Sequence, residues 1–169
     1  MYKRQAIGAA YIFKRNGETW SETHILTASD GNSLYRFGVS VAIDGNYAIV
    51  GAHAYGENDH GSAYIFERSG DNWSEVKILT TPVPLNNDQF GFSVAIHGNY
   101  AIVGARYDDY DGKTNAGSAY IYKRDGTWNQ THKLTPSDGV NDDFFGSSVA
   151  IDGSYAIVGA VGDDDNGSS

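Results

Sequence analysis

The sequence predicts an all-β protein built from one repeated unit of antiparallel strands. The segment FGVSVAIDGNYAIVGA at residues 37–52 returns at residues 90–105 and 145–160, and thirteen of its sixteen positions are identical in all three copies. The 21 Gly and 12 Tyr residues suit short strands with tight turns, and no long stretch has the 3.6-residue period of a helix. Because the copies recur at spacings of 53 and 55 residues, we expect an array of units that bury their apolar faces against one another.

The chain opens with two strands that return later, at residues 8–15 and 20–27. The first, GAAYIFKR, carries apolar side chains on both of its faces, so both faces are expected to be buried. The dipeptide Asn16-Gly17 is a turn signal. The second strand, WSETHILT, is more polar, which is typical of a strand nearer the solvent.

The repeated segment supplies two further strands, at residues 37–43 and 47–52. The Asp44-Gly45 pair between them is the strongest short-range signal of a hairpin, because glycine adopts positive φ at low cost. The run YAIVGA is almost entirely apolar, which is the mark of a strand buried on both faces.

Four strand types recur in a fixed order. We label them A (FGxSVAI), B (YAIVGA), C (GSAYIF) and D (WxxxxxLT), and they follow one another as C-D, A-B-C-D, A-B-C-D and A-B. Twelve such strands make three four-stranded antiparallel sheets, one of them split between the two ends of the chain. Serial sheets of this kind are typical of the blades of a β-propeller. We expect one repeat domain, residues 1–169, divided into residues 1–36, 37–89, 90–144 and 145–169.

Three blades are fewer than the four to eight that propellers typically have. Strands A-B at one end and C-D at the other leave unpaired edges, and such edges template association. We therefore expect two chains to join head to tail as a homodimer, a six-bladed ring in which each seam blade combines A-B of one chain with C-D of the next. The alternative is that the sequence is part of a longer propeller.

These repeats resemble FG-GAP repeats, the blade unit of the integrin α-subunit propeller and of many bacterial secreted or surface proteins. The resemblance implies a β-propeller, an extracellular or cell-surface location, and a non-enzymatic role in adhesion or ligand binding. It is closest to the bacterial form, and the proline of GAP is missing in every copy. The residues that carry it are Phe37-Gly38, Phe90-Gly91 and Phe145-Gly146 for FG, and Gly51-Ala52-His53, Gly104-Ala105-Arg106 and Gly159-Ala160-Val161 for GAP.

Integrin-type repeats hold calcium between strands A and B, but here that loop has shrunk to segments such as Asp44-Gly45-Asn46, too short to supply six to eight oxygen ligands. Acidic residues gather instead in the loops between strands B and C, where their oxygens could bind Ca²⁺. The alternative is that they are hydrated turn residues. The candidate calcium ligands are Asp108, Asp109, Asp111, Asn115, Asp163, Asp164 and Asp165.

Aromatic residues dominate the candidate ligand contacts. The three tryptophans occupy one repeat position on strand D, so a shared packing role explains them, with stacking against a sugar ring as the alternative. The loop at residues 106–116 is the longest of the variable loops, and we expect a protein or glycan ligand there. The candidate ligand-binding residues are Trp20, Trp73, Trp128, Arg106, Tyr107 and Tyr110.

Composition and motifs exclude several classes of function. A formal net charge of −9 argues against a nucleic-acid partner, and the absence of cysteine excludes a thiol nucleophile or a cysteine-bound zinc. There is no apolar run long enough for membrane insertion, and residues 1–7 lack the apolar centre of a secretory signal. No nucleophile elbow, HExxH, P-loop or dinucleotide motif occurs, so we expect no enzyme and no catalytic residues. A lectin-like propeller and a purely structural assembly module stay open beside adhesion.

Overall fold

The computed structural model describes residues 8–30, 36–53, 60–82 and 87–164. Every secondary-structure element in these residues is a β-strand. Twelve strands form four separate antiparallel sheets. The expected all-β fold of four-stranded antiparallel blades is confirmed. Within the described ranges, the chain has no helix of the length and apolar character needed to cross a membrane.

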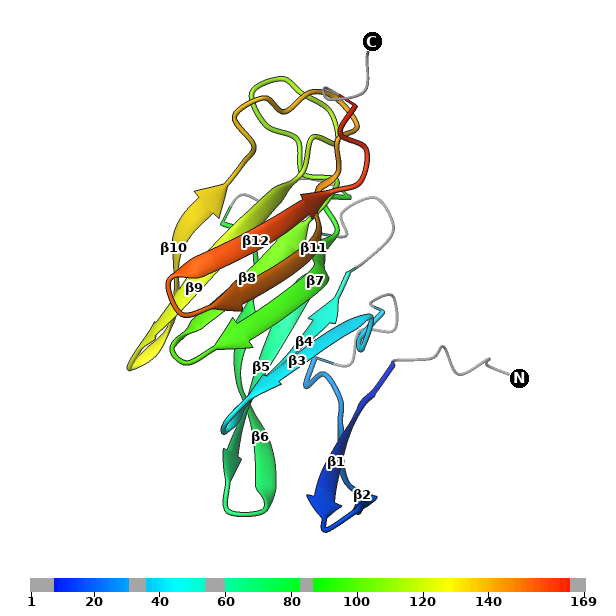
Figure 1. Cartoon of the computed structure of the whole chain (residues 1–169), viewed down its shortest axis with the longest axis vertical. Coiled ribbons are helices and arrows are strands. Elements are labelled where there is room, and N and C mark those ends of the chain that lie inside the picture. The colour runs from blue at the N-terminus through cyan, green and yellow to red at the C-terminus, as the bar shows by residue number, and fades with distance from the viewer. Residues whose placement is uncertain (1–7, 31–35, 54–59, 83–86, 165–169) are drawn as a thin grey trace, which may run out of the picture.

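Two of the sheets are complete, each with four strands in sequential order (Figure 1). The first contains β3 (Ser40–Asp44), β4 (Tyr47–Ala52), β5 (Ser62–Ser69) and β6 (Asn72–Leu79). The second contains β7 (Phe90–His97), β8 (Tyr100–Ala105), β9 (Ser118–Asp125) and β10 (Thr127–Leu134).

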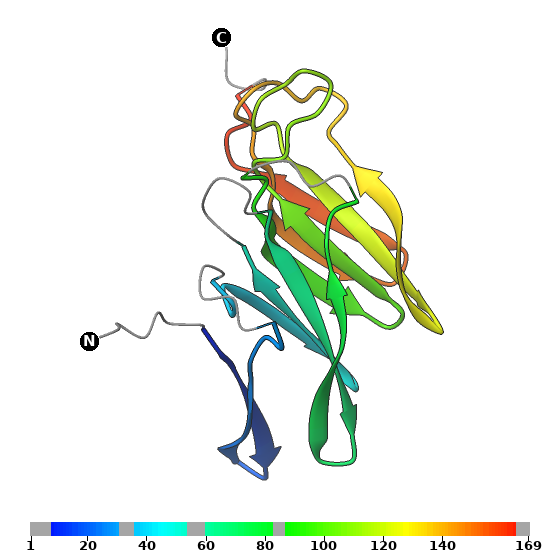
Figure 2. The same ribbon diagram turned by 180° about the vertical axis from the view of Figure 1, so that it is seen from behind.

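The two ends of the chain each carry a two-stranded sheet. At the N-terminal end β1 (Ala10–Asn16) pairs with β2 (Thr19–Leu26), and at the C-terminal end β11 (Phe145–Asp152) pairs with β12 (Tyr155–Ala160). These hairpins lie at opposite ends of the array, as the views from the front and from behind both show (Figures 1 and 2). The strand order expected from the sequence is therefore observed.

Two apolar clusters join successive sheets. The larger lies between the two complete sheets and includes Ile49 of β4 and Phe90 of β7, both fully buried. The smaller joins the first complete sheet to the β1–β2 hairpin and includes Leu26 and Tyr64. Strand β7 packs on β3 and β4, and β11 packs on β7 and β8 in the same way. Each sheet therefore completes its core against the next sheet.

The β1–β2 hairpin keeps its place although no A and B strands join its sheet among the described residues. Gly8 forms a parallel bridge with Phe37, just as Gly61 does with Phe90 one repeat later. The Asp30 carboxylate accepts a hydrogen bond of 2.9 Å from the hydroxyl of Tyr64. These contacts fix the hairpin against the first complete sheet.

The FG and GA motifs meet where neighbouring sheets touch through their backbones. Gly146, at φ +94°, follows Phe145 in a bulge of β11, and its carbonyl oxygen accepts a hydrogen bond of 2.7 Å from Ser93 Oγ. A side chain at Gly104 would collide with that same oxygen. The contact recurs one repeat earlier between Gly51 and the Gly91 carbonyl. These glycines therefore set the distance between sheets.

The phenylalanine of each FG pair packs edge-on against aromatic rings of strand C. The ring centroid of Phe90 lies 5.5 Å from that of Tyr120 and 6.3 Å from that of Tyr122. Phe37 makes the equivalent contacts in the first complete sheet. Edge-to-face pairs of this kind contribute about 0.5–1.5 kcal/mol each beyond the area they bury.

We predict that Gly104→Ala strongly destabilises the protein. The added methyl group meets backbone atoms that cannot rotate away, so the free energy of unfolding should fall by about 3 kcal/mol. Gly98→Ala is the matched control, because Gly98 has positive φ but open space around it, and its cost should be about 1 kcal/mol. Urea unfolding of both variants measures the difference, and equal costs would contradict the role given to Gly104.

We also predict that Tyr122 makes the fold sensitive to alkali. Burial raises the pKa of Tyr122 above its ordinary value of 10.0, and its hydroxyl donates to the Thr80 carbonyl oxygen at 2.9 Å. The unfolded chain then loses this proton at lower pH than the folded chain, so the free energy of unfolding falls as the pH rises above 10.0.

Tyr122→Phe should cost about 1 kcal/mol at neutral pH, because one hydrogen bond is lost, and should reduce the alkaline fall in stability. The difference in the free energy of unfolding between the variant and the original protein should therefore shrink in alkali. Urea unfolding over a pH series tests this, and curves that stay parallel would refute it.

Candidate ligand-binding rim

Two loops lie side by side at one end of the second complete sheet, and we call them the rim loops. They are residues 106–117, between β8 and β9, and residues 135–144, between β10 and β11. Strands β8 and β10 both run antiparallel to β9 and therefore parallel to each other, so their C-terminal ends lie at the same end of the sheet. Both rim loops are seen at the top of Figure 1.

Hydrogen bonds lock the rim loops together. Asn141 Oδ1 accepts from the backbone N–H of Thr114 at 2.9 Å, and Asn115 Nδ2 donates to Asp142 Oδ1 at 2.8 Å. Asn115 and Asp142 have positive φ values of 51° and 64°, a conformation that Asn and Asp tolerate better than most residues. The rim loops therefore hold one another in a defined shape.

Asp108, a candidate calcium ligand, is buried and already engaged. Its Oδ2 accepts a hydrogen bond of 2.5 Å from the Tyr120 hydroxyl and forms an ion pair of 2.9 Å with Lys133 Nζ. Burial, together with the hydrogen bond to Asp108, raises the pKa of Tyr120. Asp108 thus ties the first rim loop to strands β9 and β10.

The other candidate calcium ligands do not form a metal site among the described residues. Asp109 Oδ1 accepts from the backbone N–H of Asn115 at 2.7 Å, while Asp111, Asp163 and Asp164 are exposed. Asp165 lies outside the described residues. In the part of the chain that the structure describes, no three His, Cys, Asp or Glu residues gather as a metal site requires. Calcium binding stays a prediction from the sequence.

Arg106 and Tyr107 are held within a stack of aromatic rings. The guanidinium carbon of Arg106 lies 3.8 Å from the Phe92 ring centroid, and Arg106 Nε donates to Gln89 Oε1 at 2.8 Å. The Tyr107 ring lies 5.3 Å from that of Phe144. Both Arg106 and Tyr107 are half-buried, so each is fixed in place and still open to the solvent on part of its surface.

Sequence reasoning missed the residues that support this stack. Phe92 occupies the one variable position of strand A, where the other copies have Val39 and Ser147. Gln89 and Phe144 share the position just before the FG pair, which also differs between copies. Divergence within an otherwise constant repeat was the signal that could have found them.

Tyr110 lies in a markedly acidic part of the rim. Its hydroxyl donates to the Pro136 carbonyl oxygen at 3.4 Å, and the ring lies 5.2 Å from Lys113 Nζ. Burial raises the pKa of Tyr110, and the negative charges of Asp143, Asp111 and Asp138 raise it further. The rim loops therefore present a negative field around their aromatic residues.

The three candidate tryptophans lie away from the rim loops and from one another, on β2, β6 and β10. Trp128 is only 3% exposed and packs edge-on against Tyr47 of the preceding sheet, with ring centroids 5.9 Å apart. Trp73 is half-buried and Trp20 is exposed. One repeat position thus has three environments, because within the described ranges a preceding sheet lies beside Trp128 and none lies beside Trp20.

The sequence profile of the FG-GAP repeat matches the chain three times, at residues 20–66, 73–122 and 128–169. Each match begins at a tryptophan of strand D, and together the matches span most of the chain. The repeat indicates a β-propeller, in agreement with the serial four-stranded sheets. A search of curated proteins finds no match.

We predict that Asp108 supports the fold of the rim. Asp108→Asn removes a buried charge that faces Lys133 and Tyr120, so the free energy of unfolding should fall by about 1–3 kcal/mol. Asp109→Asn keeps its acceptor oxygen on an exposed side chain and should change stability by less than about 0.5 kcal/mol. Thermal unfolding of the two variants compares them, and a neutral Asp108→Asn would refute the structural role.

Proposed function

The chain belongs to the FG-GAP repeat family, and from that premise we propose that it is a non-catalytic module that binds a protein ligand at its rim loops, outside the cell or at the cell surface. FG-GAP repeats are typical of extracellular and surface proteins, and the family is generally non-enzymatic. Both properties support adhesion or ligand binding over catalysis.

The observation that carries the proposal is the stack of Arg106 and Tyr107 on Phe92 and Phe144. Arginine and aromatic side chains are the residues most enriched at the energetic centres of protein interfaces. Here they are half-buried and already fixed by ring contacts and by the hydrogen bond from Arg106 to Gln89. Binding therefore costs little side-chain entropy.

Charge indicates the chemistry of the ligand. The rim loops expose Asp109, Asp111, Asp138 and Asp142, and the whole chain has a formal net charge of −9. A surface of this sign favours a partner with clustered Lys or Arg side chains and speeds its approach. The preferred ligand is a basic protein segment that sets its cations against the carboxylates and an apolar residue against the ring stack.

A carbohydrate ligand is the weaker candidate. Its sequence argument depended on the tryptophans of strand D, and the indole of Trp128 is covered by Tyr47. A sugar would need to stack on Tyr107 instead. We therefore treat glycan binding as an outcome of the test below and not as a second proposal.

We predict that a displayed library of random peptides, selected on the immobilised chain, becomes enriched in peptides with Lys and Arg. The double variant Asp109→Asn/Asp111→Asn should weaken the selected peptides at least about tenfold, and added salt should weaken them further. Asp125→Asn changes an equally exposed carboxylate at the β9–β10 turn, at the other end of the sheet, and should leave affinity unchanged.

Peptides that bind the rim variant as well as the original chain would overturn the proposed site. An unenriched peptide pool, combined with signal on a glycan array that is lost in Tyr107→Ala, would replace the protein ligand with a carbohydrate.

A further inference from the structure

Identical repeat positions are buried in the middle of the chain and exposed at its ends. Tyr64 and Tyr120 of strand C are 0% and 3% exposed, whereas their copy Tyr11 is 54% exposed. Ile49 of strand B is 0% exposed, and its copy Ile157 is 71% exposed. The strands are otherwise alike, so the difference comes from whether a neighbouring hairpin covers them.

An apolar cavity of about 540 Å³ lies between the β1–β2 hairpin and the first complete sheet. Its lining includes Tyr11 and Phe13 of β1 and Val41 and Ile43 of β3. In the complete sheets, the residues equivalent to Tyr11 and Phe13 pack on strands A and B of their own sheet. The cavity therefore lies where strands A and B would complete the β1–β2 sheet.

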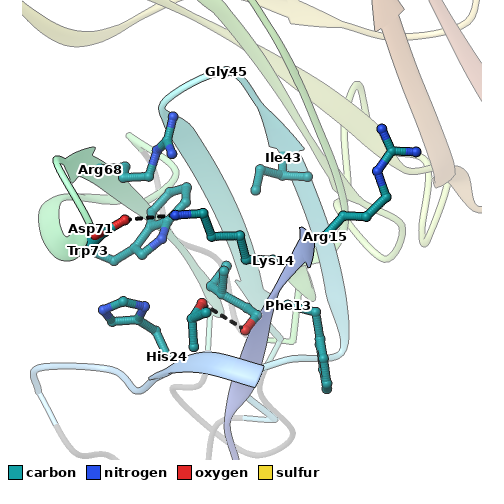
Figure 3. A pocket seen from close by; sticks show the side chains of 11 residues that line it. Phe13, Lys14, Arg15, His24, Ile43, Gly45, Arg68, Asp71 and Trp73 are labelled. Atoms are coloured by element: carbon teal, nitrogen blue, oxygen red, sulfur yellow. Dashed lines mark hydrogen bonds and ion pairs between the residues drawn. The ribbon is translucent and has the colours of Figure 1, made fainter. Parts of the chain in front are cut away.

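A second cavity of about 540 Å³ lies beside it and is more polar (Figure 3). Figure 3 shows Trp73 and Arg68 of the first complete sheet facing the side chains of β1. An ion pair of 3.0 Å between Lys14 and Asp71 crosses it. The two cavities thus form one slot that follows the open edge of β1.

We propose that the β11–β12 hairpin of a second copy of this chain fills this slot, so that two copies close into one ring. The complete sheets provide the register, because β4 pairs with β5 through Tyr47 and Glu67, Ile49 and Ile65, and Gly51 and Ala63. The same register pairs β12 with β1 of the partner through Tyr155 and Lys14, Ile157 and Ile12, and Gly159 and Ala10.

Side-chain contacts between the two complete sheets show which contacts are absent at the ends of the array. Tyr47 packs against Trp128, and the guanidinium carbon of Arg124 lies 4.5 Å from the Tyr47 ring centroid. Tyr100 and Tyr155 are the two copies of Tyr47, and both are exposed. In the ring, Tyr155 packs on the partner's Trp73 and the partner's Arg68, and Tyr100 packs on the partner's Trp20 and the partner's Arg15.

The FG motif is also incomplete at the seam. Phe90 packs on Tyr120 and Tyr122 of its own sheet, but among the described residues the sheet of Phe145 contains no strand C. In the ring, Phe145 packs on the partner's Tyr11 and the partner's Phe13. The exposed apolar residues at both ends of the chain then become core.

Two copies are the number that closes the ring. The described residues of one chain form two complete sheets and two half sheets, so two such stretches make six blades, within the four to eight of typical propellers. Three copies would give nine. The same seam forms twice, and it pairs the open edges of β12 and β1 in both places.

The first test is the mass of the chain in solution. Sedimentation velocity at micromolar concentration should give twice the chain mass of 18.3 kDa. A species of one chain mass would overturn the proposal and leave the slot to further repeats of a longer protein. Particles that keep growing with concentration would overturn it too, because they show a contact that does not close.

The second test separates the seam from the fold. Gly159 is the copy of Gly51 and Gly104, but the nearest atoms that a side chain there would meet, among the described residues, all belong to Ser148, and the closest is its hydroxyl oxygen. Gly159→Ala should therefore leave the circular dichroism spectrum unchanged and raise the dimer dissociation constant at least about tenfold, because its methyl group meets the backbone of the partner. An unchanged dissociation constant in a folded Gly159→Ala variant would overturn the seam.

The third test determines the register of the seam by disulfide formation between introduced cysteines. The chain has no cysteine of its own, so every disulfide reports on the introduced pair. Ala52 pairs with Ser62 in the first complete sheet, and the corresponding seam pair is Ala160 with the partner's Ala9. A mixture of Ala9→Cys and Ala160→Cys chains should give disulfide-linked dimers under mild oxidation. Ala52→Cys/Ser62→Cys, which should link within one chain, is the positive control.

Val161→Cys replaces Ala160→Cys in the negative control, because it lies one residue further and points to the opposite face. Equal linking by Val161→Cys, or none by Ala160→Cys while the positive control links, would overturn the proposed register.

Discussion

The structure depends on the close approach of neighbouring sheets, backbone to backbone, at glycine positions. Gly51 faces the Gly91 carbonyl and Gly104 faces the Gly146 carbonyl, with a serine hydroxyl bound to each of these oxygens. These contacts hold neighbouring sheets close together, so the apolar face of strand A packs into the core of the preceding sheet.

Much of the fold could be predicted because the repeat displays each strand several times. The pattern of apolar side chains, the hairpin signals and the fixed order of the strand types predicted twelve strands in the order that the structure has them. The structure adds that strand A bulges at the FG pair, where Phe90 pairs with Ala105 but Ser93 pairs with Gly104. Period-two patterns do not reveal such a bulge, which lies where the backbone of strand A contacts the neighbouring sheet.

The candidate site was less accessible to sequence reasoning. Asp108 stands in a run of acidic residues and was grouped with them as a metal ligand, yet the fold turns it inward to Lys133 and Tyr120. Trp20 and Trp128 share a repeat position but differ in burial, because burial depends on which sheet stands beside each one. Partners distant in the sequence decided each of these environments.

The bracing of the rim loops has a consequence for avidity. The hydrogen bonds that shape the rim join the rim loops to one another and to Gln89 and Tyr120 of the same chain, so the rim takes its shape without a partner. A ring of two copies would therefore display the same acidic, aromatic surface twice, half a turn apart. Such a bivalent particle could cross-link two partners or grip one repetitive surface, and weak individual contacts would then suffice for lasting attachment.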